Sequence, residues 1–290
     1  MEEKEAIKAS KVSIIINLVL SALKLIAGII AYSYAMISDA IHSASDVVSS
    51  VIVIVGVKIA NKQSDKSHPY GHERFECIAS LVLASILVVT GIGIGISGIQ
   101  NIATGEYKNF EIPGIIALIA AVISIAVKEG MYWYARGIAK KINSSAVMAD
   151  AWHHRSDALS SVGSFIGILG ARLGFLVLDS IASVVISIFI VKAGIEIFIQ
   201  TVRELTDEAC DEETVNKIYT IINKQAGVMR IDEVKTRKFG TKIYVDVEIS
   251  ADGEKTLKET HQIAENIHND IERELTQVKH CMVHVNPYEE

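Results

Sequence analysis

Long apolar stretches separated by short polar loops fill the first two thirds of the chain, whereas the last third is polar and charged. A helix needs roughly 20 apolar residues to cross the hydrocarbon core of a bilayer. Six stretches reach about that length: 11–32, 36–60, 77–101, 112–135, 145–170 and 175–202. The stretches 36–60 and 145–170 are the least apolar, so we expect them inside the bundle rather than facing lipid. The pattern predicts a membrane all-α bundle of six transmembrane helices over residues 1–205.

Residues 206–290 have the patterning of a small α+β domain. Helical apolar spacing over 211–225 and 256–276 predicts two helices. Alternation with a period of two predicts strands in VKTRKFG and KIYVDVEIS, on either side of Gly240, and in KHCMVHV. The predicted order is α-β-β-α-β, with two helices on a three-stranded sheet. We therefore expect two domains, 1–205 in the membrane and 206–290 outside it.

Basic residues lie mostly on one side of the predicted bundle. The loops on one side hold only Lys108 and Arg172. The N-terminal tail and the loops on the other side hold Lys4, Lys8, Lys11, Lys62, Lys66, Arg74, Arg136, Lys140 and Lys141. Because cytoplasmic loops carry the excess of Lys and Arg, we expect a multi-pass protein of the cell membrane with both termini in the cytoplasm. Because the N-terminus is charged and no small-residue cleavage site follows it, we expect no cleavable signal peptide.

Composition and charge argue against several classes of protein. The net charge of −6 at pH 7 does not favour nucleic acid as a partner. The three cysteines, Cys77, Cys210 and Cys281, are far apart in the sequence and include no C-x-x-C pair. The sequence therefore predicts neither a disulfide framework nor a zinc finger.

An eight-residue motif occurs twice, once in each of the two less apolar stretches, as DAIHSASD and DAWHHRSD. On a helix, His42 and Asp46 lie one turn apart on one face, as do His153 and Asp157. Ionisable groups in hydrocarbon are costly and normally face a polar interior that has a function. Two histidines and two aspartates make a four-ligand set for a divalent transition metal. The alternative is a pair of hydrogen-bond networks that hold helices together.

The two motifs also contain two further aspartates and one further histidine. Asp39 and Asp150, which begin them, are expected to lie around the ligands or at a helix end rather than to bind metal. His154 lies one residue off the ligand face and is expected to be a packed or hydrogen-bonded histidine.

Paired His-x-x-x-Asp motifs in the second and fifth of six helices, followed by a cytoplasmic α/β tail, resemble the cation diffusion facilitator family. The loop DKSHPYGHERFE also resembles that family's loop between the second and third helices. The resemblance implies a homodimer that exports divalent metal in exchange for protons, with a ferredoxin-like or metallochaperone-like tail. The four motif ligands match the transport site, and this His and Asp set is associated with zinc-type members. Manganese-type members tend to have only Asp there.

The resemblance implies two further metal sites. Asp65, His68 and His72 match a site in the cytoplasmic loop, although a turn capped by His and Asp is an alternative. In the tail, the matching positions are Asp232, Glu248, His261 and His284.

The tail match is partial, because Asp232 and Glu248 occur where histidines are common and Asn286 where a carboxylate is common. The resemblance also implies an ion pair between Arg74 and Asp207, for which a weak surface pair is the alternative. His268 and His280 are expected on a solvated face, without a metal role.

We therefore expect a non-enzymatic efflux transporter for zinc, with no cofactor beyond the bound metal and with protons and the lipid bilayer as its other partners. Manganese, iron, cobalt or cadmium as main substrate remains open, as does a membrane metal sensor or channel. A metallohydrolase is disfavoured, because catalytic zinc usually has three protein ligands and an open position. A channel usually has ligand rings from symmetric subunits, and the tail has no nucleotide- or DNA-binding signature of a sensor.

Overall fold

The computed structural model describes residues 2–30, 46–105, 115–175 and 177–288. The chain forms two compact units, Met1–Thr201 and Val202–Glu290. The predicted domain boundary after residue 205 falls at the end of a helix that begins in the first unit, and it stays a prediction.

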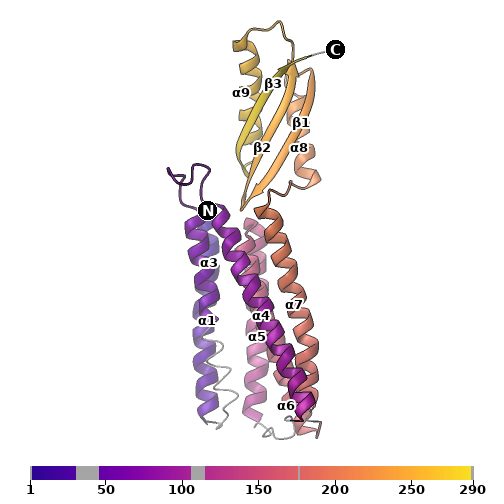
Figure 1. Ribbon diagram of the computed structural model, residues 1–290. Helices are drawn as coiled ribbons and strands as arrows, with labels where there is room; N and C mark the ends of the chain where they lie inside the picture. The colour runs from indigo at the N-terminus through magenta and orange to yellow at the C-terminus, as the bar shows by residue number, and fades with distance from the viewer. Residues whose placement is uncertain (1, 31–45, 106–114, 176, 289–290) are drawn as a thin grey trace. The chain divides into compact units, whose positions relative to one another are not determined.

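Helices make up the regular structure described in the first unit (Figure 1). They are α1 Glu2–Ile30, α3 Val47–Ala60, α4 Arg74–Thr104, α5 Ile115–Ile142, α6 Ser145–Arg172 and α7 Leu178–Leu205. Among the described residues, Lys4–Ile26, Arg74–Thr104 and Leu118–Ile142 are long and apolar enough to cross a membrane. Over its described residues, helix α3 is apolar but shorter than these three spans. The predicted number of six spans therefore stays a prediction.

Beside its buried apolar core, the helical unit buries many polar residues and exposes many apolar ones, as α1 illustrates. Ser10, Ser13 and Asn17 of α1 are at most 2 % exposed, whereas Ile15 and Leu18 are 60 % and 54 % exposed. Water would favour the opposite arrangement, because exposed apolar area is costly there. A polar interior inside an apolar outer surface is the arrangement expected of a bundle surrounded by hydrocarbon.

Glycines let the helices approach one another closely. A Cβ atom added to Gly56 of α3 would lie 2.4 Å from the Cβ of Ala79 in α4. A Cβ atom added to Gly91 of α4 would lie 2.9 Å from side-chain atoms of Ile190 and Val191 in α7. Small residues at helix contacts are typical of packing in membranes, where dispersion contacts replace the hydrophobic effect.

The second unit contains α8 Glu212–Asn223, β1 Arg230–Phe239, β2 Lys242–Ala251, α9 Leu257–Glu274 and β3 Val278–Pro287. This order confirms the predicted α-β-β-α-β sequence of elements. The sheet order is β1-β2-β3, with β1 antiparallel and β3 parallel to β2. The hairpin turns at Gly240, whose φ of 62° is in the left-handed region that glycine adopts readily. Helix α9 makes the crossover that parallel pairing requires.

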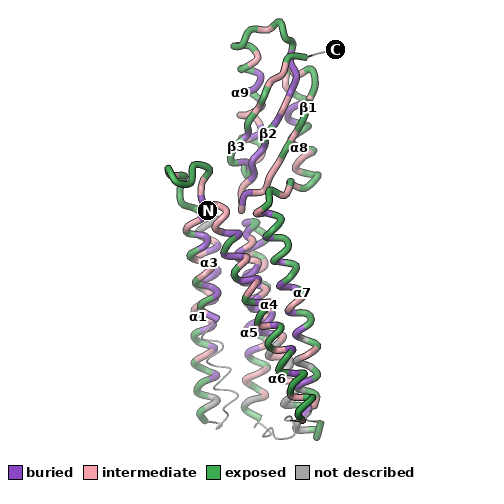
Figure 2. Tube along the Cα trace, viewed as in Figure 1, coloured by how far each residue is buried: buried purple, intermediate pink, exposed green. Residues whose placement is uncertain are grey.

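Both helices of the second unit pack on one face of the sheet. Alternate residues of β2, including Val245 and Val247, are buried with Ile218 of α8 and with Ile267 and Ile271 of α9. The burial of β2 and of the inner helix faces is visible in Figure 2. The other β2 residues face the opposite side of the sheet, because side chains alternate along a strand.

Candidate metal centre

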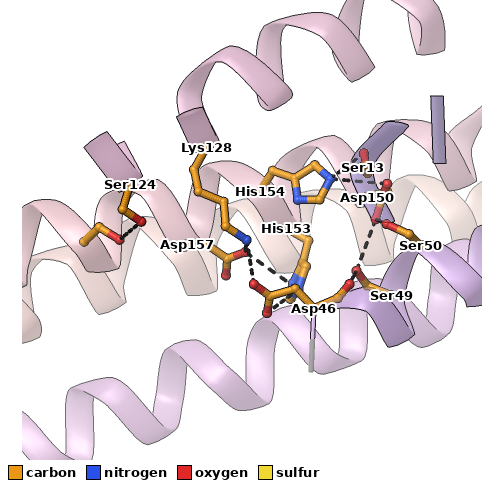
Figure 3. Close-up of polar contacts among 11 residues, drawn as sticks. Ser13, Asp46, Ser49, Ser50, Ser124, Lys128, Asp150, His153, His154 and Asp157 are labelled. Carbon is orange, nitrogen blue, oxygen red and sulfur yellow. Dashed lines mark hydrogen bonds and ion pairs between the residues drawn. The ribbon is translucent and has the colours of Figure 1, made fainter. Parts of the chain in front are cut away.

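Three of the four ligands predicted in the repeated motif meet between α3 and α6. Asp46 immediately precedes α3, and His153 and Asp157 lie one turn apart on α6. All three are at most 7 % exposed. Nε2 of His153 lies 3.7 Å from Asp46 Oδ1 and 4.0 Å from Asp157 Oδ2. Their three ligand atoms lie within 4.8 Å of one another (Figure 3), a spacing that side-chain rotation can close around one ion.

The predicted fourth ligand, His42, lies outside the described residues, as does Asp39. The structure therefore brings together Asp46, His153 and Asp157 and does not place the remaining motif residues. The four-ligand assignment stays a prediction.

A lysine that sequence reasoning missed joins the same cluster. Lys128 of α5 donates hydrogen bonds from Nζ to Asp46 Oδ2 at 2.5 Å and to Asp157 Oδ2 at 2.8 Å (Figure 3). Its side chain is only 1 % exposed. The signal was a lysine within the predicted apolar stretch 112–135, where an ionisable residue is by default a functional candidate.

The charges explain what this arrangement can bind. Two carboxylates, one ammonium and the imidazole of His153 lie together in a site with little access to water. Burying the charge of a carboxylate is costly unless a cation balances it. A divalent cation would neutralise both carboxylates, whereas Lys128 alone balances only one of them. These donors could hold a divalent ion, which would have to displace Lys128 from the carboxylates.

A neighbouring polar network links α1, α3 and α6. Asp150 Oδ1 accepts hydrogen bonds from Ser49 at 3.2 Å and Ser50 at 3.5 Å. His154 Nε2 lies 3.0 Å from the hydroxyl of Ser13 and 3.5 Å from Asp150 Oδ2. These contacts place Asp150 and His154 beside the ligand cluster, where they crosslink three helices (Figure 3).

The predicted loop residues also lie together. Asp65 Oδ1 lies 3.6 Å from His68 Nδ1, and Asp65 Oδ2 lies 3.4 Å from His72 Nε2. Asp65 accepts hydrogen bonds from Lys62 Nζ at 2.6 Å, from Ser67 Oγ at 2.7 Å and from the backbone N–H of His68 at 2.9 Å. These donors, Lys62 first, hold the pKa of Asp65 well below its usual value. The loop therefore presents a carboxylate with a lowered pKa between two imidazoles.

The predicted tail residues do not form one cluster within the described chain. Glu248 and His284 are paired across β2 and β3, on the sheet face that α8 and α9 leave uncovered. Asp232 accepts hydrogen bonds from Ser250 Oγ at 2.6 Å and Asn286 Nδ2 at 3.3 Å, and these with Arg230 lower its pKa. His261 lies on α9, which packs against the opposite face. A shared tail site would need a second chain and stays a prediction.

Two further expectations concern residues outside this cluster. Arg74 begins α4 and Asp207 follows α7, so they belong to different units and their pairing stays a prediction.

His268 and His280, given no metal role from the sequence, lie with Glu272 in a third group whose ligand atoms are within 4.8 Å of one another. The spacing of four residues between His268 and Glu272 on α9 was an available signal, but nothing in the local sequence pointed to His280 on β3.

Comparison with known proteins covers nearly the whole chain. A family model described as "Cation efflux transmembrane domain" matches residues 10–206, and one described as "Cation efflux protein, cytoplasmic domain" matches residues 210–288. The manganese efflux system protein MneP of Bacillus subtilis is 36 % identical over 295 residues, covering 99 % of this chain and 98 % of its own length. An uncharacterized transporter of Methanocaldococcus jannaschii is 37 % identical over 287 residues, covering 98 % and 99 %.

One further relative and one solved domain are also similar to this chain. The manganese efflux system protein MneS of Bacillus subtilis is 34 % identical over 292 residues, covering 100 % of this chain and 98 % of its own length. A solved C-terminal domain of MamM is 23 % identical, covers 27 % of this chain and 100 % of its own length, and has a TM-score of 0.27.

Proposed function

This chain belongs to the cation diffusion facilitator family of metal transporters, and we propose that it exports a divalent metal, mainly zinc, from the cytoplasm in exchange for protons. The observation that supports this best is the buried group of Asp46, His153 and Asp157, with Lys128 bound to both carboxylates. A buried pair of carboxylates that already holds one cation of the protein itself is suited to exchanging cations.

The proposed exchange follows from the chemistry of the ligands. A histidine or carboxylate must be deprotonated to bind metal, so metal binding displaces protons. Unperturbed imidazole changes its charge near physiological pH, which makes His153 and His42 candidates for the proton carrier. A site open alternately to the two sides of the membrane would release metal outside and protons inside. The aspartates stay ionised and return to Lys128 when the metal leaves.

Zinc is the substrate that the donor types favour. Zinc is commonly bound by imidazole nitrogen and carboxylate oxygen in tetrahedral sites. His153 with Asp46 and Asp157 supplies three such donors, and His42 is the proposed fourth.

Manganese is the second candidate, because MneP and MneS, each matched over nearly its whole length, are named as manganese efflux proteins. Carboxylate oxygens suit manganese better than nitrogen does. The proportion of oxygen donors in the site therefore decides between zinc and manganese. Asp46 and Asp157 are proposed as ligands whichever of the two metals is transported.

The proposal includes a homodimer in the cell membrane with both chain ends in the cytoplasm. The closed set of buried ligands leaves no position for an activated water, so it suits a carrier rather than a hydrolase. Residues 206–290 are proposed to hold two chains together, and to pair Glu248 and His284 of one chain with His261 of the other.

Flux into proteoliposomes tests this function. The full-length protein is reconstituted, a pH gradient is imposed, and uptake of zinc and manganese is measured separately and in competition. We expect metal to enter the vesicles while protons leave them down their gradient. Uptake should stop when the gradient is collapsed, and zinc should be transported faster than manganese. Flux that ignores the gradient would exclude proton exchange. A higher rate for manganese, with the gradient still required, would make manganese the main substrate.

A further inference from the structure

A separate group of metal-binding side chains lies at the edge of the sheet in the second unit. His268 and Glu272 lie one turn apart on α9, and His280 lies on β3, the edge strand that follows it. Their three ligand atoms lie within 4.8 Å of one another. None of these residues belongs to the transport, loop or predicted tail sets.

The separations fit a tetrahedral ion. His268 Nε2 lies 3.3 Å from Glu272 Oε1, and His280 Nδ1 lies 3.5 Å from the same oxygen. Zinc bonds to nitrogen and oxygen are about 2.0–2.2 Å, which puts tetrahedral ligand atoms about 3.3–3.5 Å apart. The two imidazole rings meet edge to face with centroids 5.5 Å apart. The two nitrogen–oxygen distances therefore already match those around a zinc ion, and the two nitrogens lie within 4.8 Å of each other.

Backbone groups of the edge strand hold two of the side chains in place. His268 Nδ1 donates to the carbonyl oxygen of Cys281 at 2.6 Å, and the N–H of Cys281 donates to Glu272 Oε1 at 3.1 Å. A histidine that binds metal almost always donates its other ring nitrogen to such an acceptor, which fixes the tautomer. The lone pair of His268 Nε2 therefore points toward Glu272 and His280.

We propose that His268, Glu272 and His280 bind a divalent transition metal of the zinc class, with a fourth position open to water. Two imidazoles and one glutamate form a known donor set for such an open zinc site. The side chains are 32 %, 31 % and 49 % exposed, so the ion enters from solvent without opening the fold. Bound metal crosslinks α9 to the edge strand β3.

The neighbouring thiol is not the fourth ligand. Cys281 is 1 % exposed and belongs to the apolar core of the unit. Burial, followed by the nearby charge of Glu272, raises the pKa of this thiol to about 12.

Carbethoxylation of histidines in the full-length protein, measured by peptide mass spectrometry with and without zinc sulfate, tests the site residue by residue. At zinc about four times the dissociation constant, mass action leaves roughly a fifth of the sites empty. We expect modification of His268 and His280 to slow by roughly fivefold. Glu272→Gln keeps an acceptor for Cys281 N–H but removes the charge, and should abolish this protection at the same zinc concentration. Glu265→Gln makes the same change at an exposed position of α9 and is the matched control. In this variant, zinc should still protect His268 and His280.

Three other results would contradict the proposed site of His268, Glu272 and His280. Unchanged modification of His268 and His280 at saturating zinc would show that they bind no metal. Protection of His261 and His284 alone would assign tail metal to the other set. Protection that persists in Glu272→Gln would remove the carboxylate from the ligand set and overturn the three-residue site.

Discussion

Lys128 places a fixed cation between the two aspartates that are proposed to bind transported metal. Its distances of 2.5 Å to Asp46 and 2.8 Å to Asp157 leave no space for an ion between Nζ and the carboxylates. Metal binding therefore requires Lys128 to move, and metal release allows it to return. In the proposed mechanism, this competition lowers the affinity of the site for metal, and the returning Lys128 again balances charge on the buried carboxylates.

Lys128→Gln should strengthen zinc binding and slow transport. Without the competing cation, we expect the apparent affinity to rise by about tenfold, which is about 1.4 kcal/mol, and metal release to become slower. Equilibrium dialysis of the detergent-solubilised protein and flux into proteoliposomes measure the two effects. Lys141→Gln is the control, because Lys141 is 67 % exposed and paired with Glu5. An unchanged affinity would mean that Lys128 does not compete with metal.

Asp157→Asn should remove transport while leaving the protein folded. The amide keeps the shape of the side chain but loses the charge, so zinc affinity at the buried site should fall by roughly a hundredfold or more. Glu129→Gln on the neighbouring helix α5 makes the same chemical change at a partly exposed position and should transport normally. Size-exclusion chromatography checks folding of both variants. Transport by Asp157→Asn at the wild-type rate would exclude Asp157 as a ligand.

At the scale of elements, the loop after α3 forms its polar cluster from residues close in sequence. Aspartate is ionised at physiological pH, and hydrogen bonds from Lys62, Ser67 and the His68 backbone lower the pKa of Asp65 further. Any pH dependence of metal binding in this loop must therefore come from the histidines.

Zinc binding to the loop should weaken as the pH falls from about 7.5 to 5.5, since protons and metal compete for imidazole in that range. Asp65→Asn should lose the loop-bound zinc and keep transport. Zinc protection of His68 and His72 from carbethoxylation in the full-length protein measures this. Protection that is equal at both pH values would show that the loop histidines do not bind the metal.

Helix α9 begins with a capping box, in which Thr256 and Glu259 bind each other's backbone N–H groups. Thr256→Ala should destabilise the second unit by about 1 kcal/mol. Its melting temperature should then fall by about 4–8 °C if the unit unfolds by itself. Thr220→Ala, at an exposed position inside α8, is the control and should not lower it. An unchanged melting temperature in Thr256→Ala would show that the cap contributes nothing measurable.

At the scale of the whole molecule, the second unit has an apolar core of its own, built from both helices and the sheet. Residues 206–290 produced alone should therefore fold cooperatively and dimerise. Urea unfolding and analytical ultracentrifugation measure this, and Ile267→Asn, at a fully buried position, should unfold the fragment. A folded fragment that remains monomeric at high concentration would move the dimer contact into the membrane unit.

Much of the architecture follows from local patterns that a sequence displays. The order α-β-β-α-β follows from periods of 3.6 and 2 along the tail, because these periods decide which side chains can share a buried face. The pairing of His153 with Asp157, and the loop group of Asp65, His68 and His72, depend on separations of a few residues. Backbone geometry alone holds such residues close together.

The repeated motif predicted that Asp46 would meet His153 and Asp157, but only the tertiary structure decided the other contacts between distant segments of the described chain. Lys128 lies 82 residues from Asp46, and His280 joins His268 and Glu272 because β3 docks beside α9. The same packing puts His261 on the opposite side of the sheet from Glu248 and His284, although family resemblance grouped them. Spacing along the chain determines neighbours within one helix or loop. Which faces of different elements meet is decided by how their side chains pack, and that information is spread over the whole sequence.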